Sequence, residues 1–250
     1  MQDLVSPMAT GSGPIVAEPA SWETIEAYAA DQVGEAAEGR GPRRTQAVEA
    51  RYRRYTEWCS SRGHTGVDLI LATAIWQAAD AGPERHPVRV ALEVNIVPYY
   101  CEAGISHWVL WYHPDDLPGT ADLDPELYLP HLRVFLPALR AADEVLAFQN
   151  RPQFRSVPQM AHAHIFLRPR TDATTAALAA LRRERLIRSP WAEAERAAGR
   201  GDEVHLLRVG FGLGLGSGFD PQRSAARAGG LHRAAASSRV RLRPLRPSIQ

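Results

Sequence analysis

Two histidines, His162 and His164, stand two positions apart in an apolar segment and are the first candidates for chemistry in this chain. In a β-strand they would share one face with Phe166, roughly 7 Å apart, because a strand rises about 3.3 Å per residue. The opposite face would be uniformly apolar, as is typical of a strand packed on a core; it comprises Ala161, Ala163, Ile165 and Leu167. Two adjacent imidazoles can attack a phosphate ester, bind a metal ion, or form a structural hydrogen-bonded network. The residues alone leave these three interpretations open.

Polar and basic residues flank the histidine pair and favour an anionic ligand, because guanidinium groups bind phosphate and carboxylate through paired hydrogen bonds. The candidate catalytic residues are His164 and His162, with histidine acting as nucleophile or as general acid–base. The predicted ligand-binding residues are Asn150, Arg151, Ser156, Arg168, Arg170 and His107.

In this mechanism a neutral imidazole of the pair attacks a phosphoryl group, and water resolves the covalent intermediate. Arginine neutralises the charge that develops on the non-bridging oxygens. The mechanism requires that the histidine face line a cleft. The metal alternative adds Glu93 or Glu102 as a third ligand, whereas the phosphate mechanism needs neither a cofactor nor a metal.

The elements that must position these residues change in character along the chain. Helical spacing dominates residues 21–80, strand alternation dominates residues 86–170, and a further helical stretch follows over residues 171–200. We expect an α+β domain with a mainly antiparallel sheet. The predicted helices cover 21–30, 45–60, 67–79, 125–142 and 171–187, the fourth kinked or split by Pro130 and Pro137; the predicted strands cover 88–97, 106–112, 145–149 and 162–167.

The two ends of the chain show no period that would bury a face. Residues 1–20 predict a disordered leader, and residues 201–250, rich in Arg, Gly and Ala, predict a disordered tail. From Arg200 onward nine arginines accompany three acidic residues. Such a tail could bind nucleic acid weakly, but we expect a solvated extension.

The composition excludes several function classes. All 29 basic residues are arginines, so neither Schiff-base catalysis nor a lysine-bearing P-loop is available. The net charge of +1 gives the whole chain no strong field toward nucleic acid or membranes. Cys59 and Cys101 predict neither a disulfide framework nor a cysteine-based zinc site. Without a signal peptide or an apolar run of about 20 residues, the sequence predicts a soluble cytoplasmic protein.

Short motifs occur in a distinctive order from the N-terminal third to the histidine segment. They are Ser21-Trp22-Glu23, a helix with Arg43, Tyr55 and Trp58, then Leu71 to Trp76, Asn95 to Tyr99, Gly104 to Trp111, Phe148 to Pro152, Ser156 to Pro158 and His162 to His164. This combination resembles the fungal N-acetylglucosamine-induced protein family, a domain family of undefined activity, over about residues 22–170. The sugar in that name implies nothing about a substrate.

The histidine segment also resembles, remotely, the histidine-triad fold. That family carries an Asn, a Gly-rich stretch and three alternate histidines followed by Pro-Arg. Here Asn150, His162, His164 and Pro169-Arg170 occupy corresponding places. The resemblance implies a nucleophilic role for His164 with His162 supporting it. Phe166 stands in the place of the third histidine and the Gly-rich stretch is absent, departures that concern the activity more than the fold.

Two function classes follow. The first is a histidine-dependent protein for a phosphorylated small molecule, such as a nucleotide or sugar nucleotide; an enzyme of this class would be a nucleotidyl hydrolase or transferase. The second is a non-catalytic regulatory or interaction module of the same fold. His164 and the arginines favour the first class, and Phe166 favours the second.

Overall fold

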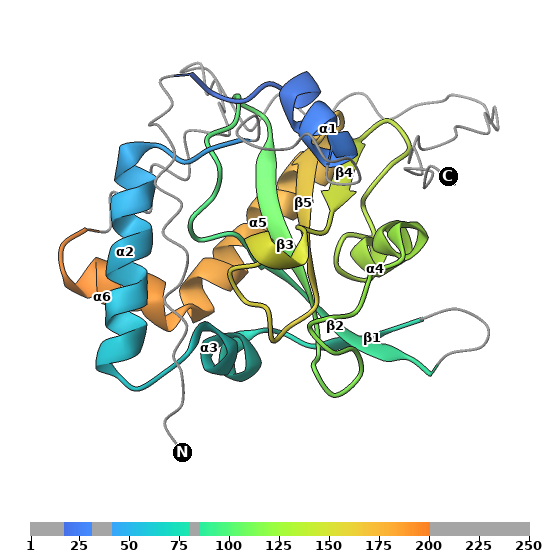
Figure 1. Cartoon of the computed structure of the whole chain (residues 1–250). Helices are drawn as coiled ribbons and strands as arrows, with labels where there is room; N and C mark the ends of the chain where they lie inside the picture. Colours follow the sequence, from blue (N-terminus) through green and yellow to red (C-terminus); the bar gives the residue numbers. More distant parts are fainter. Residues whose placement is uncertain (1–17, 32–41, 81–85, 201–250) are drawn as a thin grey trace, which may run out of the picture.

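A five-stranded antiparallel sheet lies at the centre of the computed structural model, which describes residues 18–31, 42–80 and 86–200 (Figure 1). The strand order is β1-β2-β3-β5-β4. The strands are β1 (Gln77–Ala79), β2 (Val88–Val94), β3 (Ser106–Tyr112), β4 (Glu144–Phe148) and β5 (His162–Arg168). Helices accompany this sheet, which confirms the predicted α+β class.

Most of the helices begin at a residue whose side chain caps the first turn. Thr45, Thr65, Thr171 and Ser189 each accept a hydrogen bond from a backbone N–H three residues later, which satisfies a donor that the helix itself cannot. The helices are α1 (Trp22–Asp31), α2 (Gln46–Ser61), α3 (Gly66–Thr73), α4 (Tyr128–Phe135), α5 (Asp172–Arg188) and α6 (Pro190–Ala197), with short 3₁₀ turns at Pro125–Leu127 and Pro152–Phe154.

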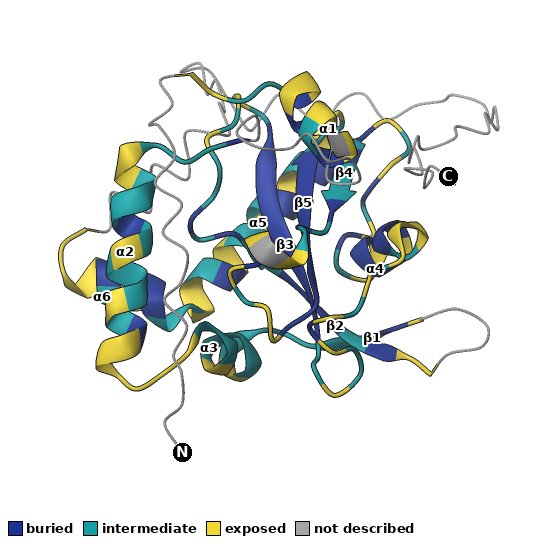
Figure 2. Ribbon diagram, in the orientation of Figure 1, coloured by how far each residue is buried: buried dark blue, intermediate teal, exposed yellow. Residues whose placement is uncertain are grey.

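One face of the sheet carries the main hydrophobic core. The apolar residues of β2, β3 and β5 alternate onto this face and pack against α4 and α5 through Leu132 and Leu178. The expected core face of the histidine strand, with Ala163 and Ile165 among its members, lies here and is fully buried. Figure 2 shows β3 and β5 buried along nearly their whole length.

The other face of the sheet carries the histidines and is covered in two places. Helix α1 packs Trp22 and Ile25 against Phe148 and Phe166 at one end. Helix α3 packs over Ala91, Val109 and Trp111 near β2, together with the chain around Met160. Because β5 has partners on both sides, its histidines lie inside the sheet rather than at an edge.

The third helix is shorter in the structure than the sequence predicts. It was expected over residues 67–79, but α3 ends at Thr73 and residues 77–79 form the edge strand β1, paired with β2 from Gln77↔Val90 to Ala79↔Val88. The local sequence is alanine-rich and suits a helix. Pairing with the exposed edge of β2 overrides that local preference, as tertiary context often does.

The expected helix over 125–142 is also shorter. It consists of a 3₁₀ turn and α4, which ends at Phe135 because Pro137 forces Leu136 out of helical geometry, with φ −125° and ψ 66°. Pro130 lies in the first turn, where its missing N–H costs nothing. The C-terminal helical stretch is likewise two helices, since Ser189 ends α5 and caps α6.

The predictions for the ends fall mostly outside the described residues, which begin at 18 and stop at 200. Within the predicted leader, residues 18–20 are described, and Ala20 forms a parallel bridge with Cys101. Among the described helices, none combines the length and apolarity that a membrane crossing requires.

Candidate functional site

His107 and His164 face each other across neighbouring strands on the covered face of the sheet. The antiparallel register pairs His107 with Phe166 and Val109 with His164, so the two histidines are diagonal neighbours. Their Nε2 and Nδ1 atoms lie 2.9 Å apart. The structure therefore brings together two residues that are 57 positions apart in the sequence.

The hydrogen bonds at His107 determine its tautomer. The backbone N–H of Tyr99 donates to His107 Nδ1 over 3.2 Å. A backbone amide can only donate, so Nδ1 is the acceptor and Nε2 of the neutral ring carries the proton. His107 Nε2 then donates to His164 Nδ1, and His164 carries its own proton on Nε2.

The far end of this chain is Asn150, whose side-chain amide lies 2.9 Å from His164 Nε2. The oxygen and nitrogen of an amide have nearly the same shape and are assigned from their hydrogen bonds. Since His164 Nε2 carries a proton, the Asn150 oxygen belongs at this contact, which also pairs an Oδ1 otherwise without a partner among the described residues. The result is a closed chain from Tyr99 through His107 and His164 to Asn150.

Aromatic rings enclose the two histidines. Tyr99 and Phe166 stack on the His107 ring with centroids 4.9 and 4.3 Å away, and Phe148 lies 5.6 Å from the His164 ring. Burial is the main cause that lowers the pKa of His107 and of His164 well below the usual value, with the positive charge of Arg44 and the neighbouring histidines as smaller causes. Both rings are therefore neutral at pH 7.

His162 lies on the same face of the sheet but takes no part in the hydrogen-bonded series from Tyr99 to Asn150. Its Nδ1 donates to the carbonyl of Met160 over 2.9 Å, and its ring packs on Trp111 with centroids 4.7 Å apart. It is 2% exposed, and burial lowers its pKa. The phosphoryl mechanism requires a cleft beside the histidines. His107, His162 and His164 are instead buried against their neighbours.

Stability should fall as the pH drops below about 6.5. Four buried histidines, His107, His131, His162 and His164, have depressed pKa values when folded, so below 6.5 these groups bind more protons in the unfolded chain than in the folded one. Each such group contributes a slope of about 1.4 kcal/mol per pH unit. Urea unfolding at intervals from pH 7.0 to 5.0 measures this slope, and a free energy of unfolding that stays constant over that range would contradict it.

Glu93 supplies an internal control for this experiment. Its pKa is raised to about 7, so between its unfolded and folded pKa values it gains a proton on folding and opposes the histidines. In Glu93→Gln the opposing proton is absent, and the acid loss of stability should be steeper than in the unmodified chain.

The arginines of the predicted anion site do not gather at the histidines. Arg168 binds Glu144, its cross-strand partner, through two hydrogen bonds of 2.6 and 2.7 Å, and Arg170 also pairs with Glu144 at 2.5 Å. Arg168 lies four residues beyond His164, roughly 13 Å along the strand. Its guanidinium also covers the ring of Trp22, so this cluster fastens β4, β5 and α1.

The loop after Asn150 distributes the remaining predicted residues. Arg155, which also flanks the histidines in sequence, is buried and donates to the carbonyls of Asn150 (2.8 Å) and Gly119 (2.6 Å). Arg151 is half-buried at the start of the 3₁₀ turn. Ser156 is exposed and lines a separate cavity. Of the predicted site, the structure thus brings together His107, His164 and Asn150 through hydrogen bonds, and His162 through an edge-on contact with the His164 ring, with centroids 5.7 Å apart.

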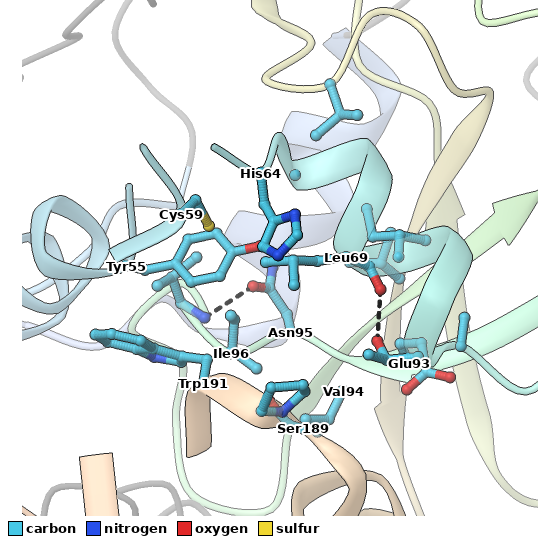
Figure 3. Close-up of a pocket in the computed structure, with 18 of the residues that line it drawn as sticks. Tyr55, Cys59, His64, Leu69, Glu93, Val94, Asn95, Ile96, Ser189 and Trp191 are labelled. Atoms are coloured by element: carbon cyan, nitrogen blue, oxygen red, sulfur yellow. Dashed lines mark hydrogen bonds between the residues drawn. The ribbon is translucent and has the colours of Figure 1, made fainter. Parts of the chain in front are cut away.

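That cavity, of about 330 Å³, lies between α2, α3, β2 and the α5–α6 junction. In Figure 3, Tyr55, His64 and Leu69 stand on one side of the hollow and Trp191 and Ser189 on the other. The wall is mainly apolar and aromatic, with a few polar groups among its lining residues, including Glu93, Asn95, Arg185 and Arg188. This composition is typical of small-molecule sites.

Asn95 connects the cavity wall to the histidine chain. Its Oδ1 accepts the backbone N–H of Val97 over 3.0 Å, which directs Nδ2 toward the His107 ring, 3.2 Å from Nε2 and 3.4 Å from Nδ1. The Nδ1 lone pair is already taken by the Tyr99 N–H, so the Asn95 amide is in polar contact with the His107 ring without being the main donor to its acceptor. The buried chain therefore supports one wall of the cavity.

Glu93 and Arg185 form the charged part of the cavity. Arg185 is 4% exposed; its Nε donates to the carbonyl of Leu92 over 3.0 Å and lies 3.5 Å from Glu93 Oε1. The same Oε1 accepts the backbone N–H of Ile75 over 3.2 Å. Burial raises the pKa of Glu93 to about 7, against the opposing effect of Arg185. The carboxyl can therefore change charge near neutral pH.

The metal alternative finds no support in this geometry. Within the described ranges, no cluster of three or more His, Cys, Asp or Glu side chains is arranged to hold a metal ion. Glu93 is committed to Arg185 and the Ile75 amide rather than to the histidines. Glu102 lies exposed in the loop before β3.

Sequence reasoning missed the cavity, although two signals were present. Glu93 lies on the face of β2 opposite the core residues Leu92 and Val94, and its sequence position suggested only a metal ligand. Arg185 follows Leu178 and Leu181 at helical spacing, which places a charge on the buried side of α5. Trp191 and Tyr55 carry no comparable local signal, because their roles depend on the contact between α2 and α6.

Comparisons with known proteins give one family and one structure. The sequence model of a family described as a protein of unknown function, DUF3605, matches residues 22–168. The crystal structure of HTC1 aligns with a TM-score of 0.42 and 20% sequence identity, over 66% of this chain and 96% of that one. No curated protein matches the chain.

Proposed function

The chain belongs to DUF3605, a family of proteins of unknown function, and we propose that it binds a small molecule with an apolar body in the cavity between α2, α3 and α6. One observation carries this proposal: a partly buried carboxyl and a buried guanidinium, those of Glu93 and Arg185, lie together in the wall of an otherwise mainly apolar cavity. Burying a charged group costs desolvation free energy unless the group is paired with an opposite charge or bound by a ligand. A few placed polar groups in an apolar pocket are what small-molecule recognition requires.

The geometry favours ligand binding in the cavity over catalysis at the histidines. His164 has both ring nitrogens engaged, one with His107 and one with Asn150, and its side chain is buried. A nucleophile needs a free lone pair that reaches the substrate. The phosphorylated ligand and the histidine-triad resemblance stay predictions that rest on the His-x-His strand and its flanking residues, and the N-acetylglucosamine-induced resemblance stays a prediction that rests on the order of motifs over residues 22–170.

A cavity-filling substitution tests the proposal. Leu69 on α3 lines the cavity, and Leu69→Trp should occupy its space. Indole, a neutral apolar probe, should bind the unmodified chain in isothermal titration calorimetry, and Leu69→Trp should weaken binding at least about tenfold, or about 1.4 kcal/mol.

Val134→Trp provides the matched control. Val134 is 37% exposed on α4 and does not line the cavity, so the same new side chain there should leave indole binding unchanged. Equal binding by both variants, or no binding by the unmodified chain to indole or to its acidic, amide and amine derivatives, would refute a ligand site in this cavity.

A further inference from the structure

Two side chains of the cavity lining carry buried donors that lack acceptors among the described residues. Among the described residues, Arg185 Nη1 and Trp191 Nε1 have no hydrogen-bond partner, and both side chains line the cavity. Trp191 is 3% exposed and Arg185 4%. Arg185 Nη1 does lie 3.6 Å from Glu184 Oε1, but that carboxylate is half-exposed and makes no hydrogen bond to it. A buried donor without an acceptor costs about 1–3 kcal/mol, which a ligand oxygen would recover.

The charges around these donors are unequal. Arg185 and Arg188 both line the cavity, whereas Glu93 is the only carboxylate residue that residues 18–31, 42–80 and 86–200 contribute to its lining. Glu93 is also the group that burial disposes to lose its charge. Once Glu93 is neutral, the lining residues that the structure describes hold two guanidinium groups and no carboxylate.

We propose that the ligand carries a carboxylate on a flat apolar body, that the carboxylate accepts from Arg185 and Trp191, and that Glu93 is protonated when it binds. This deepens the proposed function and rests on it. The apolar body lies among the aromatic and aliphatic side chains of the wall, including Tyr55 and Leu69. A cationic ligand would instead require ionised Glu93 and would meet the two arginines.

The groups that face Glu93 set the pH dependence. They are Arg185, Arg188 and Glu184 from α5 and the Ile75 amide from the chain after α3. With a Glu93 pKa of about 7, a ligand that needs the protonated carboxyl should bind about tenfold more weakly at pH 8 than at pH 6. His64 also lines the cavity, so it is replaced in a separate variant.

Three isosteric probes separate the ligand classes: indole-3-acetate, indole-3-acetamide and tryptamine, which are anionic, neutral and cationic. Isothermal titration calorimetry at pH 6 and pH 8 measures their affinities. We expect the acetate to bind at least about tenfold more tightly than the amide at pH 6, and tryptamine to bind most weakly. An amide or amine that binds as tightly as the acetate overturns the carboxylate proposal, while binding that Leu69→Trp abolishes still supports the cavity.

Glu93→Gln and His64→Gln identify the titrating group. Gln has the shape of a protonated Glu and retains the oxygen that accepts the Ile75 N–H. Glu93→Gln should bind indole-3-acetate equally at pH 6 and pH 8, with the affinity that the unmodified chain shows at pH 6. His64→Gln should keep the tenfold pH dependence. The reverse pattern, a dependence lost in His64→Gln and kept in Glu93→Gln, would overturn the role of Glu93.

Discussion

Replacing His164 with alanine is expected to lower the free energy of unfolding by about 3–4 kcal/mol. The substitution removes a buried ring in contact with His107 and Phe148 and leaves a cavity. It also leaves the proton on His107 Nε2 and the Asn150 amide without their shared partner. Urea unfolding at pH 7 measures the loss.

His86→Ala is the control, because His86 is exposed and its replacement should change stability by less than about 0.5 kcal/mol. Where His164→Ala is too unstable to measure, Asn150→Ala removes only the last hydrogen bond of the series, the one to His164 Nε2. This substitution should lower the free energy of unfolding by about 1–2 kcal/mol. A His164→Ala protein as stable as His86→Ala would show that the hydrogen-bonded chain contributes nothing to the fold. Loss of a phosphoryl-transfer activity with stability intact would restore the catalytic interpretation.

The strands and the histidine face could be predicted because their signals are local. Alternation over residues 88–94 and 162–167 separates the two faces of the sheet, and the structure places Ala163 and Ile165 in the core as expected. The contact between His107 and His164 could not be predicted. It depends on the pairing and register of β3 with β5, and a shift of one residue would direct either histidine to the other face.

The cavity could not be predicted for a related reason. Its wall combines residues from α2, α3, β2, α5 and α6, and no two of these elements carry a sequence pattern that specifies their relative position. The same limit explains the arginines. Arg168 looked available for an anion because the sequence does not show that Glu144 is its cross-strand partner.

The contact between α2 and α6 forms one side of the cavity and contains a buried carboxylate. Glu195 on α6 is fully buried, and its oxygens lie 3.4 Å from Arg51, 3.6 Å from Arg54 and 3.1 Å from Arg200. Arg51, itself 4% exposed, also donates to the carbonyl of Ile96 over 2.9 Å. Glu195 therefore joins α6 to α2, and Arg51 joins α2 to the chain after β2.

Glu195→Ala is expected to lower the free energy of unfolding by about 3–5 kcal/mol, because it removes the carboxylate that three arginines share, one of them buried. Trp191, one turn earlier on α6, packs edge-on against Tyr55 and Trp58 with centroids 5.7 and 5.6 Å away. Loosening α6 should displace this ring from the cavity wall, so indole binding should weaken together with stability.

Glu193→Ala is the matched control for this change, since Glu193 is exposed on the same helix and its loss should cost less than about 0.5 kcal/mol. Glu195→Gln, which keeps the size of the side chain but removes its charge, should fall between the two and remain folded enough for calorimetry. If Glu195→Ala and Glu193→Ala unfold at the same urea concentration, the buried carboxylate does not hold α6 against α2. If Glu195→Gln loses stability but binds indole normally, α6 is not needed to shape the cavity, and the wall must be held by α3 and β2 alone.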